Sequence, residues 1–239
     1  MTTYAEFARF YDQIMGDRGP DIERIRGYIR RFRPSAATLL ELGCGTGALL
    51  ADLGKDLAVT GVDRSPQMLA RAAINAEGAR LVQADMTSFA LNTRFDVVIC
   101  VFDTLNHLAR WESWVALFDR VHEHLADDGI FAFDVNTTGR MRGLWQSPDF
   151  AEDFGPHTVL MDISPAGGDL SLWRVRIFER LDGDLFRLHQ ETIPELAVPL
   201  TRIRAALEPI FEILEETGLG GGAASDASAR AFFACRRRQ

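Results

Sequence analysis

Hydrophobic positions follow two periods along the first 140 residues. Over Asp21–Phe32 the apolar side chains fall three or four positions apart, which predicts a surface helix. From residue 38 to residue 135, short apolar runs alternate with segments of helical spacing, and Phe95–Phe102 is apolar almost throughout, as is typical of a central parallel strand. The expected strands are Thr38–Leu42, Leu57–Val62, Arg80–Ala84, Phe95–Phe102 and Ile130–Val135. This alternation predicts an α/β fold, a three-layer, doubly wound and mostly parallel sheet with helices on both faces.

The pattern changes after residue 140. Apolar and charged residues alternate over Trp173–Ile177, the period of a half-buried strand, and Asp182-Gly183 is a hairpin signal before a returning strand, Leu185–His189. Thr158–Ile163 is a further strand candidate. We therefore expect an antiparallel insertion after the fifth strand. The remaining elements, which bring the main sheet to seven strands, are a helix from Leu200 and the strands Phe211–Leu214 and Ala229–Cys235.

No second hydrophobic core separates these parts, so a single domain over 1–239 is expected. Its parts are an N-terminal helical cover (1–37), a core (38–139), the insertion (140–195) and the last helix and strands (196–239). The longest apolar runs fall far short of the ~20 residues that span a bilayer. The N-terminus has no basic start followed by an apolar signal region, which indicates a cytoplasmic protein without membrane attachment.

Composition and charge limit the kinds of binding partner that this chain is expected to have. Lys and Arg number 26 against 34 Asp and Glu, and the net charge of −8 repels polyanions, so nucleic acid is not expected as a partner. The three cysteines, Cys44, Cys100 and Cys235, lack metal-ligand spacing, so neither a metal site nor a disulfide framework is predicted.

Candidate chemistry gathers where the first three strands end. Gly43-x-Gly45-x-Gly47 permits a tight turn beside a helix N-terminus. Asp63 follows Gly43 by twenty residues, where a carboxylate can accept hydrogen bonds from both hydroxyls of a ribose, and Asp85 ends the third strand. Because ligands bind outside the carboxyl ends of parallel strands, these residues predict a nucleoside pocket. Gly43, Gly45 and Ala48 also fit the dinucleotide fingerprint in its alanine-ended form, so a nicotinamide cofactor remains an alternative.

The longer string Leu40-Glu-Leu-Gly-Cys-Gly-Thr-Gly47 resembles motif I of the Rossmann-like, class I methyltransferases that depend on S-adenosylmethionine. Val62–Leu69, Gln83–Met86 and Phe95–Val98 resemble the family's second strand and helix cap, its adenine-side turn and its fourth strand. The N-terminal residues Tyr4, Phe7, Ala8, Tyr11 and Asp12 are similar to a subgroup of small-molecule methyltransferases that includes amino-sugar N-methyltransferases and carries an insertion at the same place.

The resemblance implies roles for individual residues. Glu41 would orient the methionine end of the cofactor, the glycine turn would approach it, and Asp63 would hold the ribose. Arg64 and Met68 would flank the adenine and Asp85 and Met86 would contact its edge, while Phe102 would pack near the sulfonium and Tyr11 would close over the cofactor. The cofactor-binding set is Tyr11, Glu41, Gly43, Cys44, Gly45, Gly47, Asp63, Arg64, Met68, Asp85, Met86 and Phe102. A sulfonium cation suits this carboxylate-lined cleft, whereas the pyrophosphate of a dinucleotide would be repelled by Glu41.

The acceptor side follows the fourth strand. His107 is the candidate general base, with Asp103 and Asn106 beside it and Trp145 from the insertion as candidate substrate contacts. The alternative for His107 is a packing or capping role before the Trp111 helix.

The sequence thus predicts an enzyme that transfers a methyl group from S-adenosylmethionine to a nitrogen or oxygen of a small molecule, leaving S-adenosylhomocysteine. A non-catalytic S-adenosylmethionine-binding regulator and an NAD(P)-dependent reductase are the alternatives. A homodimer formed through the insertion is a further expectation.

Overall fold

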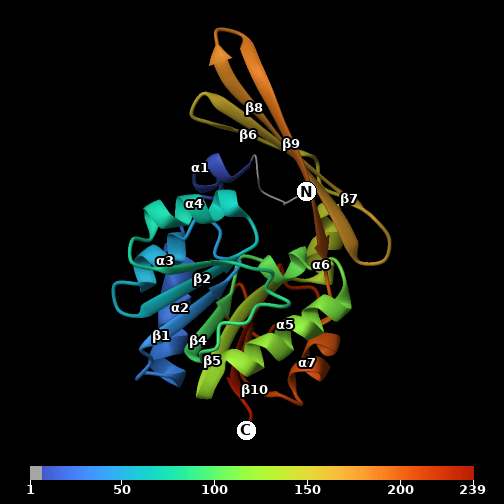
Figure 1. The fold of residues 1–239 in the computed structure, drawn as a ribbon. Coiled ribbons are helices and arrows are strands. Elements are labelled where there is room, and N and C mark those ends of the chain that lie inside the picture. The colour runs from blue at the N-terminus through green and yellow to red at the C-terminus, as the bar shows by residue number, and fades with distance from the viewer. Residues whose placement is uncertain (1–6) are drawn as a thin grey trace.

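Seven strands form the main sheet in the order β10-β11-β5-β4-β1-β2-β3 (Figure 1). The computed structural model describes residues 7–239, so Tyr4 lies outside the described residues. β11 is antiparallel to both its neighbours, and the pairs that join β5, β4, β1, β2 and β3 are all parallel. The strands are β1 (Thr38–Leu42), β2 (Ala58–Asp63), β3 (Arg80–Gln83), β4 (Phe95–Cys100), β5 (Leu125–Asn136), β10 (Phe211–Gly218) and β11 (Arg230–Arg237).

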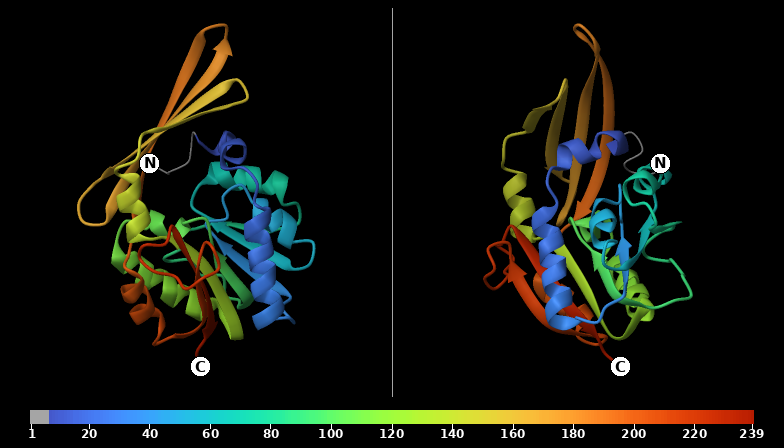
Figure 2. Two further views of the ribbon diagram at one scale, coloured as in Figure 1. Left: turned by 180° about the vertical axis from the view of Figure 1, so that it is seen from behind. Right: turned by 90° about the vertical axis from the view of Figure 1, so that its left-hand side faces the viewer.

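Helices cover both faces of this sheet, as the sequence predicts. On one face α5 (Trp111–His124) and α7 (Leu200–Leu207) pack a core that includes Trp114, Phe118 and Ile203. On the other, α2 (Gly19–Phe32) and α3 (Ala48–Leu53) pack a second core. Figure 2 shows α2, in blue, and α5, in yellow-green, on opposite sides of the sheet in its right-hand view. The remaining helices are η1 (Phe7–Arg9), α1 (Tyr11–Met15), α4 (Pro66–Asn75), η2 (Thr104–His107) and α6 (Thr138–Leu144).

A separate antiparallel sheet forms the insertion after β5 and extends away from the main sheet (Figure 1). Its strands are β6 (Phe150–Phe154), β7 (His157–Pro165), β8 (Leu170–Asp182) and β9 (Leu185–Leu196). The N-terminal Phe7 and Phe10 pack against Val159 and Ile177 on one face of this sheet. The insertion and the N-terminal segment therefore meet above the carboxyl ends of the main strands.

The structure departs from the sequence prediction most clearly in three places. Residues 84–94, between β3 and β4, contain turns and no helix, so the strand-helix alternation is interrupted there. β5 begins at Leu125 rather than Ile130, with a shift in its register against β4. β6 was not expected, because its five residues are mostly exposed and lack apolar alternation.

Candidate functional site

A cavity of about 440 Å³ opens at the carboxyl ends of the central strands, under the insertion and the N-terminal segment. It lies where strand order reverses between β1 and β4, the usual ligand position in an open α/β sheet. The predicted site residues that line it are Tyr11, Gly43, Gly45, Asp63, Arg64, Met68, Asp85, Met86, Phe102, Asp103 and His107. Most of the predicted cofactor set therefore lies around one space.

The glycine turn forms the floor of the cavity. The backbone N–H groups of Gly43 and Cys44 both donate to the carbonyl of Val62, at 2.8 and 3.1 Å, which ties the turn to the end of β2. Gly43 has a φ of +70°, and a Cβ there would overlap the side chain of Thr104. Only glycine gives both this backbone conformation and the open surface that a ligand can approach.

Glu41 lies at the end of β1 below this turn and is only 4% exposed. Its Oε2 is buried without a hydrogen-bond partner among the described residues. Burial, and then the neighbouring Asp63, raise the pKa of Glu41 well above its usual range, and the positive charge of Arg18 acts in the opposite direction. A buried and unsatisfied carboxylate is costly, so this position fits a cationic or hydrogen-bond-donating ligand group.

Asp63 is held by backbone amides at the end of β2. One carboxylate oxygen accepts the N–H of Gly45 at 2.9 Å and the other that of Ser65 at 2.8 Å. Burial raises the pKa of Asp63, although these two hydrogen bonds oppose the shift. Each oxygen keeps a lone pair, so the fixed carboxylate can still accept from a pair of hydroxyl groups.

The adenine side is built from β2, α4 and the turn after β3. Ser65 caps α4 by accepting the N–H of Met68, which places the Met68 side chain in the cavity wall. Asp85 is exposed and accepts from the N–H and hydroxyl of Thr87 through a single oxygen, Oδ1. Its second oxygen has no hydrogen-bond partner in the described structure and can accept from a ligand.

The turn after β4 has an uncommon backbone. Phe102 and Asp103 have φ values of +60° and +49°, in the left-handed region that residues other than glycine rarely adopt. The buried carboxylate of Asp134 on β5 accepts both of their N–H groups, at 2.7 and 3.0 Å. Arg230 pairs with Asp103 and Asp134 at 2.7 and 3.0 Å. This network fixes the direction of Phe102 and of the following residues.

Two residues from the N-terminal segment face Phe102. The guanidinium of Arg18 lies 4.0 Å from the centre of the Phe102 ring and 5.5 Å from that of Tyr11. Burial raises the pKa of Tyr11 to about 12, so its hydroxyl stays neutral and can donate. Sequence reasoning missed Arg18, because an arginine beside a glycine and a proline carries no motif.

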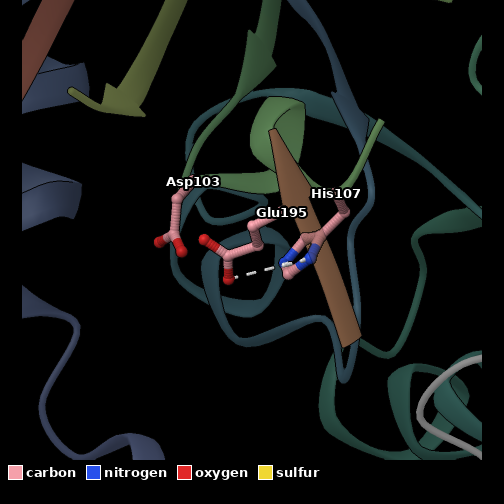
Figure 3. Close-up of side chains that lie close together, drawn as sticks. All are labelled: Asp103, His107 and Glu195. Carbon is pink, nitrogen blue, oxygen red and sulfur yellow. Dashed lines mark ion pairs between the residues drawn. The ribbon is translucent and has the colours of Figure 1, made fainter. Parts of the chain in front are cut away.

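The acceptor end joins η2 to the insertion. Asp103, His107 and Glu195 point toward one another, with Glu195 Oε1 3.9 Å from His107 Nδ1 (Figure 3). Their potential ligand atoms lie within 4.8 Å of one another. Burial lowers the pKa of His107, which favours the neutral imidazole. The insertion also supplies an apolar wall of Met161, Trp173, Val175 and Ile193.

Sequence reasoning missed this wall and Glu195. The wall residues and Glu195 come from β7, β8 and β9, and the pairing register of these strands decides which of their side chains face the cavity. The one available signal was Glu195 itself, a carboxylate in the otherwise apolar stretch Ile193–Val198.

The structure does not bring five predicted residues to the cavity surface, which are Glu41, Cys44, Gly47, Asn106 and Trp145. The side chain of Glu41 lies buried at the end of β1, and that of Cys44, within the glycine turn itself, is also buried. A Cβ on Gly47 would lie 3.0 Å from the Ala72 Cβ, so this glycine allows close packing of α4. Trp145 donates to the Ser171 hydroxyl at 2.8 Å, outside the cavity.

Asn106 is fully buried and joins the main sheet to the insertion. Its amide donates to the carbonyls of Asn136 and Leu196 at 3.1 and 3.0 Å, and its oxygen accepts the Asn136 N–H at 2.9 Å. These bonds use the whole side chain, so Asn106 positions η2 and β9 and does not contact a ligand in this arrangement.

Known proteins are similar to this chain in sequence and in fold. A family described as methyltransferase domain matches residues 39–129. A protein of Geobacillus sp. (strain WCH70) named as a methyltransferase is 30% identical over 98% of this chain and 100% of its own length. A dTDP-3-amino-3,6-dideoxy-alpha-D-glucopyranose N,N-dimethyltransferase of Streptomyces fradiae is 33% identical over 68% of this chain and 61% of its own.

A crystal structure of an S-adenosylmethionine-dependent methyltransferase from Clostridium acetobutylicum has the same fold. It superposes with a TM-score of 0.86, at 23% identity, over 98% of both chains. The chain belongs to the class I, S-adenosylmethionine-dependent methyltransferases, and the predicted fold, enzyme class and cofactor are confirmed. No helix in the described part of the chain is long and apolar enough to cross a membrane.

Proposed function

We propose that this enzyme transfers a methyl group from S-adenosylmethionine to an amine nitrogen of a small molecule. The observation that carries the proposal is the backbone-held carboxylate of Asp63 beside a glycine turn that lines the cavity, with the unsatisfied carboxyl group of Glu41 buried behind that turn. The Streptomyces relative named above is an N,N-dimethyltransferase, which supports nitrogen as the methylated atom. The relatives described above give no support to a non-catalytic regulator or to a nicotinamide-dependent reductase.

The residues around the glycine turn fit the cofactor. S-adenosylmethionine supplies an activated methyl group on a sulfonium, so the protein need not generate the electrophile. Asp63 would accept hydrogen bonds from the ribose and Glu41 would balance positive charge at the methionine end. The backbone of Gly43 and Gly45 would lie close to the cofactor. Arg64, Met68, Asp85 and Met86 would enclose the adenine, and Phe102 and Tyr11 would cover the reacting end.

The acceptor half of the cavity positions the nucleophile and excludes water. Alignment of a nucleophile with the methyl group lowers the barrier to such a displacement. Neutral His107 would accept a hydrogen bond from the acceptor, with Asp103 beside it. The apolar wall from the insertion keeps this end dry, which strengthens each polar contact there. The main sheet and the insertion each supply residues of the acceptor end, so we infer that the chain works as one domain.

The surroundings of the cavity favour a small acceptor over a polymer. The net charge of −8 and the covered position of the cavity disfavour nucleic acid. All three cysteines are buried free thiols, which suits the reducing cytoplasm.

The insertion exposes Phe150, Leu185 and Leu188, and we infer that two copies of the chain associate there. Light scattering that reports only a monomer at high concentration would reject this dimer.

The proposed reaction is tested by incubating the purified chain with S-adenosylmethionine and matched pairs of small amines and alcohols. Release of S-adenosylhomocysteine that depends on the acceptor would support a transferase, and NMR of the product would identify an N-methyl group. Methylation of the alcohols alone would reject nitrogen as the acceptor atom. S-adenosylhomocysteine release that no acceptor increases, across pairs of varied size, would contradict the proposal.

A further inference from the structure

Three carboxylates lie near one arginine at the acceptor end of the cavity. They belong to Asp103, Asp134 and Glu195, and the arginine is Arg230; Arg64 and Arg110 also line the cavity. Arg230 forms ion pairs with Asp103 and Asp134, so its charge is directed to these two groups. Glu195 has no arginine or lysine within ion-pair distance among the residues that the structure describes.

Glu195 is the least compensated of these carboxylates. It is 3% exposed and lines the cavity. Its Oε2 accepts one long hydrogen bond, 3.4 Å from Asn136 Nδ2, and its Oε1 lies 3.9 Å from His107 Nδ1, beyond hydrogen-bond distance. A carboxylate buried with so few partners destabilises a fold, unless a ligand supplies the missing donors.

Asp103 differs from Glu195 in this respect. Its Oδ1 accepts from Arg230 at 2.7 Å and its Oδ2 from Asn136 at 3.0 Å, so both oxygens already have donors. A divalent metal ion shared by Asp103, His107 and Glu195 would have to displace these donors and would lie close to the Arg230 charge. An ammonium group needs only the Glu195 carboxylate and a neighbouring acceptor such as neutral His107, so the contacts favour a nitrogen cation.

We propose that Glu195 binds the amino group of the acceptor as a cation and then accepts its proton, which makes the enzyme selective for amines over alcohols. This proposal rests on the proposed function. In the proton transfer an N–H bond of the ammonium breaks and its electron pair remains on nitrogen. The proton bonds to a Glu195 carboxylate oxygen, so ammonium and carboxylate become neutral amine and neutral carboxylic acid. The freed lone pair is the nucleophile that methyl transfer requires.

The same environment directs the proton to Glu195 rather than to His107. Burial raises the pKa of Glu195 well above its usual range, and the negative charge of Asp103 adds to the shift. Burial lowers the pKa of His107. The Glu195 carboxylate therefore holds a proton more readily than an ordinary glutamate, and the His107 imidazole holds one less readily than an ordinary histidine.

The test uses the full chain saturated with S-adenosylhomocysteine and two probes of one shape, cyclohexylamine and cyclohexanol. Binding of each probe is titrated by calorimetry or NMR for the wild type, for Glu195→Gln and for Glu191→Gln. Glu191 lies on the same face of β9 but outside the cavity, so it is the matched control. S-adenosylhomocysteine affinity and thermal midpoint, measured first for each protein, identify a variant that has lost its fold or its cofactor site.

We expect the wild type to bind the amine at least about tenfold more tightly than the alcohol. Glu195→Gln removes that preference, while affinities for the alcohol and for S-adenosylhomocysteine stay within about twofold, and Glu191→Gln retains the preference. Equal affinity for the two probes in the wild type, including no binding of either, overturns the proposal, as does an amine preference that survives in Glu195→Gln. If Glu195→Gln unfolds, the wild-type comparison of the two probes still decides.

Two further outcomes separate this proposal from its rivals. If Zn²⁺ or Mn²⁺ binds with an affinity that requires Glu195 and displaces the amine, the cluster is a metal site and the amine proposal fails. If S-adenosylhomocysteine does not bind the wild type, the proposed function fails, whatever the two probes show. Cofactor binding with no amine preference rejects only the role of Glu195.

Discussion

The carboxylate of Asp134 on β5 accepts the backbone N–H of Phe102, in the turn after the neighbouring strand β4, at 2.7 Å. Asp103 donates its N–H to the second oxygen of the same carboxylate. Both donors have left-handed backbone angles that would cost of order 1–3 kcal/mol each without support. One buried side chain on β5 therefore stabilises the turn that directs Phe102 and His107 to the cavity.

Asp134→Asn is expected to change how stability depends on pH. Burial raises the pKa of Asp134 to about 6 in the folded protein, against an ordinary value of about 4 when unfolded. The folded state therefore binds this proton more tightly, so the contribution of Asp134 to the free energy of unfolding is greatest below pH of about 4 and is lost as pH rises through about 6. Asparagine does not titrate.

The free energy of unfolding of the wild type relative to the variant should thus fall by about 2–3 kcal/mol between about pH 4 and pH 7. Urea denaturation of both proteins across this range measures the difference. A difference that stays constant with pH, or that grows in favour of the wild type, would show that folding does not raise the pKa of Asp134.

Gly43→Ala tests the close approach at the glycine turn, with Gly78→Ala as its control. Both glycines have positive φ, +70° and +88°, so both substitutions carry a backbone cost of roughly 1–2 kcal/mol. A Cβ at Gly78 meets nothing within 4 Å, whereas one at Gly43 overlaps Thr104. Calorimetry should show that Gly43→Ala weakens S-adenosylhomocysteine binding by at least about tenfold and that Gly78→Ala leaves it within about twofold. Equal losses in the two variants would place the turn away from the ligand.

Asn106→Ala should loosen the insertion from the main sheet. The substitution leaves the carbonyls of Asn136 and Leu196 and one N–H group buried without their partner, at a cost of roughly 2–4 kcal/mol. Thermal denaturation measures the loss, and limited proteolysis should show faster cleavage within residues 140–195. Gln190→Ala, at an exposed position on the same inserted sheet, is the control. Unchanged stability and unchanged cleavage would mean that other contacts hold the insertion in place.

The cofactor half of the site could be predicted from the sequence because its parts are local. The turn at Gly43, the Ser65 cap and the acidic end of β2 each follow from a few neighbouring residues, and parallel strands bring their carboxyl ends to one edge. The acceptor half could not be predicted in this way. Glu195 reaches His107 only through the pairing of β8 with β9 and through the Asn106 bridge.

Trp145 illustrates the same limit. Its place near the start of the insertion suggested a contact with the acceptor, but α6 directs the indole to Ser171 on β8. Tertiary contacts of this kind depend on register and helix orientation, which residue spacing alone does not specify.

Calorimetric titration of S-adenosylhomocysteine tests the central claim most directly, namely that Asp63 and its neighbours form the adenosine site. The wild type should bind, Asp63→Ala should lose at least about tenfold in affinity, and Asp119→Ala, an exposed carboxylate on α5, should bind like the wild type. Binding by Asp63→Ala that equals that of the wild type, or no binding by the wild type, would contradict the account.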